Sequence, residues 1–134
     1  MELACRKEII ELHQFFEDWF NGRPTQTDES FSRMDEVMGD GFVIVMPRGV
    51  KVDRGPLLKG LFDAHGAQPG IRIWIENIRL HADNGPLVIV EYEEWQQTDE
   101  ETDSRYSTAV FRKKEDTPNG IEWVHVHETW FNQE

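Results

Sequence analysis

Apolar residues repeat at helical spacing near the start of the chain. The positions three or four residues apart hold Cys5, Ile9, Leu12, Phe16 and Phe20. This spacing predicts one long amphipathic helix with a single apolar face. We expect it to end near residues 21–22, because Gly22 is typical of a helix end and Pro24 cannot continue the helix.

A second, shorter helix is predicted after this proline. Thr27 or Asp28 can cap its first turn through a side-chain oxygen. Its apolar residues are Phe31, Met34, Val37 and Met38. The Gly-Asp-Gly sequence at residues 39–41 then favours a break, with Asp40 capping the backbone of that turn.

A small hairpin and a third helix complete the first half. Residues 42–46 form an apolar run of strand length, and a Pro-Arg-Gly turn leads into a short partner strand at residues 49–52. Pro56 favours the first position of a helix, whose apolar stripe ends at Gly66.

From Ile71 onward the apolar positions alternate with a period of two. Alternation is typical of strands with one buried face. Turn sequences at residues 82–85, 98–103 and 116–120 divide this region into four strands. The predicted fold class is therefore α+β, with a curved antiparallel sheet wrapped around three N-terminal helices.

The last strand, residues 120–131, carries the main candidate for a reactive side chain. Alternation places Val124, Val126, Glu128 and Trp130 on one face and Trp123, His125, His127 and Thr129 on the other. Glu128 is the one ionisable group on the valine-bearing face. A carboxyl in that position lies either at a wet rim or on the floor of an apolar cavity, and the second case gives it useful chemistry.

Three segments resemble one known superfamily. These are the Met-Pro-Arg-Gly hairpin, the Leu-Leu-Lys-Gly-Leu-Phe-Asp-Ala-His-Gly helix and the ending Val-His-Val-His-Glu-Thr. With the order of the elements, they resemble the nuclear transport factor 2-like (cystatin-like α+β) superfamily, which includes the SnoaL-like polyketide cyclases. The resemblance implies a cone-shaped fold that usually dimerises through its sheet, with a cavity between helices and sheet.

The ending is also similar to the association domain of calcium/calmodulin-dependent kinase II. In that family an arginine often occupies the pocket position where this chain has Glu128. The substitution reverses the charge preference of the cavity. The anion-binding expectation of that relative is therefore not transferred to this chain.

Strand register predicts which residues accompany Glu128. If each hairpin closes near the middle of its turn, Glu128 lies opposite Tyr106. The predicted ligand-binding residues are Tyr92, Glu94, Thr108, Phe16, Trp19 and Phe62. Glu128 would then act as general acid or base, and the Tyr106 hydroxyl would donate to a developing oxyanion. Two alternatives stay open: Tyr106 merely satisfies Glu128 in the core, or a one-residue bulge exchanges the two faces.

The histidines give a weaker signal. His125 and His127 lie two residues apart on one strand face, so both rings could reach one metal with Glu91 or Glu93. The resemblance places that face on the outside, and we expect an interface or solvated pair and no metal. His13 and His65 are predicted as hydrogen-bonded residues at the edges of their helical stripes, from which both could also face the cavity mouth.

Composition limits the remaining function classes. The 134 residues suit one domain, 1–134, and the single cysteine excludes an internal disulfide. A net charge of −12 disfavours nucleic acid and anionic membranes as partners. The charged N-terminus does not fit a signal peptide, so we expect an acidic cytoplasmic protein. Without a P-loop or Gly-x-Gly-x-x-Gly sequence, no nucleotide or other cofactor is expected.

Two functions are consistent with these observations. The first is a SnoaL-like small-molecule-binding protein with a small hydrophobic ligand, acting as an acid-base isomerase, cyclase or dehydratase through Glu128 and Tyr106. The second is a non-catalytic homo-oligomerisation or interaction module with a vestigial cavity. A predicted aromatic patch on the outer sheet face favours a symmetric homodimer in either case, and its residues are Trp74, Trp95, Phe111 and Trp123.

Overall fold

A computed structural model describes residues 1–131 of the chain. The helices are α1 (Glu2–Phe20), α2 (Asp28–Asp35) and α3 (Arg54–Asp63). The strands are β1 (Met38–Val45), β2 (Lys51–Asp53), β3 (Arg72–Asn84), β4 (Leu87–Gln97), β5 (Thr102–Lys113) and β6 (Ile121–Trp130).

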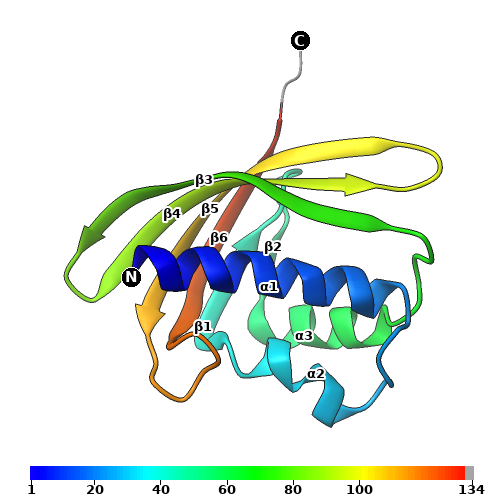
Figure 1. The fold of residues 1–134 in the computed structure, drawn as a ribbon, viewed down its shortest axis with the longest axis horizontal. Coiled ribbons are helices and arrows are strands. Elements are labelled where there is room, and N and C mark those ends of the chain that lie inside the picture. Colours follow the sequence, from blue (N-terminus) through cyan, green and yellow to red (C-terminus); the bar gives the residue numbers. More distant parts are fainter. Residues whose placement is uncertain (132–134) are drawn as a thin grey trace.

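The sheet curves over the helices and buries its concave face against them. Helix α1 runs along that face, and α2 and α3 lie beyond it (Figure 1). The apolar stripe of α1 forms the centre of the core, where Cys5, Ile9 and Leu12 are buried. This arrangement confirms the predicted α+β class, with a curved sheet over three helices from the first half of the chain.

The strands form one sheet in the order β2-β1-β6-β5-β4-β3. The meander from β3 to β6 is antiparallel, as predicted. Strand β1, however, lies parallel to β6, with Ile44 beside Val126. Alternation along the chain does not reveal which distant segments pair, so this parallel contact could not be predicted from the pattern.

The second helix is shorter than predicted. It ends at Asp35, and Met38 already begins β1. The backbone of Val37 explains the early change, because its carbonyl oxygen accepts a hydrogen bond of 2.7 Å from the Trp123 amide of β6. Sheet pairing therefore competes with helix continuation at this point, and Val37 and Met38 are buried.

A bulge in β6 changes the predicted faces near its start. Val110 pairs with His125, but the next residue, Phe111, pairs with Trp123, which leaves Val124 as the extra residue. Trp123 and Phe111 are consequently buried in the core. Their predicted place in an outer aromatic patch is wrong, because the alternation breaks at Val124.

None of the helices among residues 1–131 is both long enough and apolar enough to span a bilayer.

Candidate functional site

A cavity of about 140 Å³ lies between the helices and the concave face of the sheet. Its apolar walls come from α1, α2, α3, β1 and β6, with Phe16, Phe42 and Leu61 among them. Its polar lining residues are His13, Tyr92, Glu94, Gln96, Arg105 and Glu128. One α1 histidine therefore meets a set of side chains from three neighbouring strands, β4, β5 and β6.

The structure brings four of the predicted site residues to this cavity. They are Glu128, Glu94, Tyr92 and Phe16. Trp19 and Phe62 do not line it. They pack against each other with ring centroids 5.7 Å apart, and both contact Phe31 of α2. These two rings fill the space among the three helices, so their predicted ligand-binding place is wrong.

Tyr106 and Thr108 lie on the opposite face of the sheet. Glu128 pairs with Ser107, whereas Tyr106 pairs with Thr129. Tyr106 is 49% exposed and stacks on Phe131 at 4.6 Å between ring centroids. The predicted register was wrong by one residue. Tyr106 therefore cannot donate a hydrogen bond to an oxyanion on a ligand in the cavity, and Thr108 cannot contact such a ligand.

The same shift brings Arg105 into the cavity, and the sequence interpretation missed it. Arg105 and Ser107 share the concave face because they alternate with Tyr106. A register shifted by one residue would have found both. His13 has hydrogen-bond partners at both ring nitrogens, as predicted, and it is buried and lines the cavity.

His13 and Glu94 form a buried ion pair. The Nδ1 atom of His13 donates to the carbonyl oxygen of Ile9 at 2.7 Å, and Nε2 donates to Glu94 Oε1 at 3.1 Å. Because both ring nitrogens face acceptors, the geometry suits the doubly protonated ring. Burial opposes that charge, but the carboxylate of Glu94 outweighs burial and raises the pKa of His13.

Glu94 is the ionised acid of the site. Burial alone would raise its pKa, but the charge and hydrogen bond of His13 outweigh burial and hold that pKa at about 2. Its second oxygen accepts a hydrogen bond of 2.7 Å from Gln96 Nε2. Both oxygens of Glu94 therefore already have short partners.

Glu128 is the protonatable acid. Burial, followed by the negative charge of Glu94, raises its pKa to about 7 against the opposing charge of Arg105. Its contacts are long: Arg105 Nη1 lies 3.5 Å from Oε1, and Ser107 Oγ lies 3.4 Å from Oε2. Glu128 is only 6% exposed, so water cannot freely complete its hydrogen bonding.

Arg105 is also weakly bonded. Its two contacts, to Glu128 and Asp103, both measure 3.5 Å, and its guanidinium lies 5.0 Å from the ring centroid of Trp130. Within residues 1–131 its buried Nε atom has no hydrogen-bond partner. Burial opposes its charge, but the surrounding acids outweigh burial and raise the pKa of Arg105, so it stays cationic.

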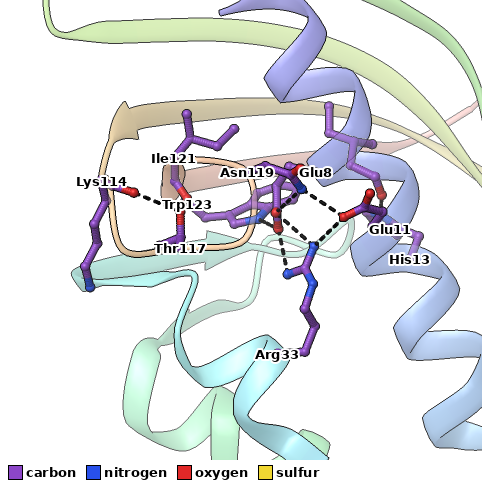
Figure 2. A network of polar contacts seen from close by, with 10 residues as sticks. Glu8, Glu11, His13, Arg33, Lys114, Thr117, Asn119, Ile121 and Trp123 are labelled. Carbon is purple, nitrogen blue, oxygen red and sulfur yellow. Dashed lines mark hydrogen bonds and ion pairs between the residues drawn. The ribbon is translucent and has the colours of Figure 1, made fainter.

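Figure 2 shows a second polar network, which joins α1, α2, the turn between β5 and β6, and β6. Glu8 accepts two hydrogen bonds from Arg33 at 2.9 and 3.1 Å, one from Asn119 at 3.1 Å and one from Trp123 Nε1 at 2.9 Å. Asn119 also donates to the more exposed Glu11 at 2.9 Å. This network fixes the indole of Trp123, which forms part of the cavity wall.

The outer face of the sheet carries the remaining candidates. The rings of His125 and His127 lie 6.4 Å apart there. Within residues 1–131 no group of three or more His, Cys, Asp or Glu side chains is arranged to hold a metal ion. On the same face Trp74 and Trp95 stack at 6.0 Å between ring centroids, and both are partly exposed.

Comparison with known proteins gives the family of this chain. Residues 5–132 match the family described as sucrose-6-phosphate phosphohydrolase C-terminal. The chain belongs to this family. Sucrose-phosphatase 2 of Nicotiana tabacum is 25% identical over 128 residues, which cover 93% of this chain but 30% of that protein. The chain thus spans about 30% of the length of its tobacco relative.

Solved structures agree on the fold. A protein of unknown function from Pseudomonas aeruginosa, described as NTF-2-like, has a TM-score of 0.86 and 26% identity, covering 96% of this chain and 99% of that one. The calcium/calmodulin-dependent kinase II hub of S. rosetta has a TM-score of 0.66 and 17% identity, covering 93% of this chain and 95% of that one. The chain therefore has the nuclear transport factor 2-like fold.

Proposed function

We propose that this protein binds a small organic molecule in the cavity and that Glu128 acts on it as general acid or base. The observation that carries the proposal is the state of Glu128: it is buried at the polar end of an apolar cavity, and it has only long contacts. A buried carboxyl without short partners gains from a ligand that completes its hydrogen bonding.

The chemistry of this end suits proton transfer. With a pKa of about 7, Glu128 is available in both protonation states near neutrality, which is the condition for efficient acid-base catalysis. Arg105 replaces Tyr106 as the group that would stabilise negative charge developing on a ligand oxygen. Isomerisation and dehydration are the reactions that these two groups support best.

The size of the cavity limits the ligand. An engineered protein cavity of about 150 Å³ holds one benzene molecule, and the cavity here is of similar volume at about 140 Å³. A ligand with one ring or a short chain fits this space, whereas a fused four-ring molecule does not. The reaction proposed here is therefore proton transfer on a small substrate.

A thermal-shift screen tests the proposal. Single-ring alcohols, amides, ketones and acids are added to the parent protein, together with sucrose 6-phosphate because the family name carries that compound. We expect a single-ring compound to raise the melting temperature of the parent and to do so much less for Glu128→Gln. Glu91→Gln is the matched control, since it removes the same charge from the outer face of β4.

The outcome against the proposal is specific. If every compound that stabilises the parent stabilises Glu128→Gln equally, Glu128 has no part in binding. If no compound stabilises the parent, the cavity does not bind this class of molecule. Turnover of a hit is then followed by deuterium exchange from solvent into the compound, which reports proton transfer directly.

We also propose self-association through the outer sheet face. The supporting observation is the stacked, partly exposed pair Trp74 and Trp95, with the exposed Tyr106 on the same face. A second copy of this chain is the partner that we infer, because the S. rosetta structure with this fold is described as a hub.

Sedimentation equilibrium tests this interface. It should show a dimer that Trp74→Glu weakens; an unchanged dimer or a monomeric parent would contradict this interface.

A further inference from the structure

The polar end of the cavity divides into a saturated half and an open half. Both oxygens of Glu94 are occupied, by His13 at 3.1 Å and by Gln96 at 2.7 Å. Glu128 and Arg105 have contacts no shorter than 3.4 Å. A ligand can therefore improve the hydrogen bonding of Glu128 and Arg105 without breaking the His13–Glu94 pair.

These two open groups require complementary hydrogen bonds. The ionised Glu128 carboxylate only accepts, and the Arg105 guanidinium only donates. Both line the same cavity and lie 3.5 Å apart at their nearest atoms. One ligand group that donates to Glu128 and accepts from Arg105 satisfies both, and hydroxyl and carboxamide groups do this.

The local charges disfavour a charged ligand. Arg105 already interacts with the carboxylates of Glu94, Glu128 and Asp103, so a ligand carboxylate would be a further acid around one arginine. A ligand amine would meet the positive charges of both Arg105 and His13. With Glu128 ionised, two acids and two bases line the cavity, and burying an additional charge there carries a desolvation penalty.

We propose that the cavity selects a neutral single-ring molecule carrying one group that both donates and accepts a hydrogen bond, such as an alcohol or a carboxamide. This inference rests on the proposed function and names the ligand class of the same site. The apolar walls contact the ring, and Glu128 and Arg105 form hydrogen bonds with the polar group.

Five probes of nearly equal size test this selection. They are toluene, benzyl alcohol, benzamide, benzoate and benzylamine, with binding followed by ligand-observed NMR and titration calorimetry at about pH 8, where Glu128 is ionised. We expect benzyl alcohol and benzamide to bind about tenfold or more tightly than toluene, because their bonds go to charged groups. Benzoate and benzylamine should bind more weakly than benzyl alcohol.

Substitutions at Arg105 and Glu128 test whether these two residues cause the preference for benzyl alcohol over toluene. Arg105→Met and Glu128→Leu each remove one of the two open groups and keep a side chain of similar length or volume. Each should reduce the preference for benzyl alcohol over toluene to within about threefold, while Glu91→Gln keeps the full preference. If either variant fails to fold, the parent still provides the test, since its own ranking of the five probes decides the outcome.

Each result has one meaning. Equal binding of toluene and benzyl alcohol overturns the selection but leaves a ligand-binding cavity. Tightest binding of benzoate or benzylamine also overturns it, and shows that the site takes an ion. Absence of binding by all five probes, with no hit in the thermal-shift screen, overturns the proposed function itself.

Discussion

Two buried glutamates, Glu8 and Glu128, lie in the same core with opposite surroundings. Glu8 is fully buried and accepts four hydrogen bonds of 2.9–3.1 Å from Arg33, Asn119 and Trp123. Glu128 is 6% exposed and has two contacts of 3.4 and 3.5 Å. The two side chains are buried to almost the same extent, but only Glu8 has short hydrogen-bond donors.

This difference separates a structural carboxylate from a candidate reactive one. Four short donors, including a two-point contact from an arginine, leave Glu8 no capacity for a ligand. Glu128 lacks short donors and faces a cavity, so its proton and its lone pairs remain available. The count of short donors is therefore a better guide to function here than burial or charge.

The largest expected loss of stability comes from removing the carboxylate of Glu8, which accepts four hydrogen bonds. Glu8→Ala should lower the free energy of unfolding by about 3 kcal/mol or more, because it leaves the Arg33 charge and the Trp123 indole without their buried acceptor. Chemical denaturation followed by circular dichroism measures the change. Glu11→Ala is the matched control, since Glu11 contacts the same Arg33 and Asn119 from a more exposed position and should cost less than about 1 kcal/mol. Equal losses in the two variants would show that Glu8 does not hold this region together.

The contribution of Glu128 to folding stability should change with pH in the opposite sense to that of an acid whose pKa is lowered by folding. The unfolded chain releases the Glu128 proton near 4.5, while the folded chain keeps it until about 7. Between these values the folded state binds more protons, so this group lowers stability as pH rises from 4.5 to about 7.

Glu128→Gln should remove that penalty. Relative to the parent, the variant should gain up to about 3 kcal/mol of stability between pH 5 and pH 8. Denaturant titrations at both pH values measure the difference. A gap between variant and parent that does not change with pH would mean that the pKa of Glu128 is not raised in the folded protein.

A smaller loss of stability is expected at Trp123, which donates to Glu8 and also lines the cavity. Trp123→Phe keeps an aromatic wall beside the cavity but removes the indole donor to Glu8. The loss should be about 1–2 kcal/mol, since Glu8 retains its other three hydrogen bonds. In a double-mutant cycle with Glu8→Gln, the two losses should not add; strict additivity would argue against the coupling.

The smallest effect is expected at Tyr106. Tyr106→Ala should leave the affinity for any cavity ligand unchanged within about twofold, because its ring stacks on Phe131 outside the cavity. Titration calorimetry with a hit from the thermal-shift screen provides the measurement. A loss as large as that of Glu128→Gln would place Tyr106 in the site and refute the pairing of Glu128 with Ser107.

Local alternation accounts for the success at Glu128 and the failure at Tyr106. From Val126 to Trp130 the strand is regular, so counting by two from a buried valine places Glu128 on the concave face. Pairing Glu128 with Tyr106 required the offset between two strands as well. That offset depends on how the turn between β5 and β6 closes and on the bulge at Val124, and the alternation of β6 alone reports neither.

The sequence by itself determined the three helices apart from the end of α2, the strands of the meander and the face that carries Glu128, because each depends on the spacing of apolar residues within one segment. Only the tertiary structure decided that Arg105 and His13 join Glu128, that β1 lies beside β6 and that Glu8 is saturated. These contacts link residues distant in the chain, and their register is set by packing and turn geometry, which periodicity within a segment does not encode.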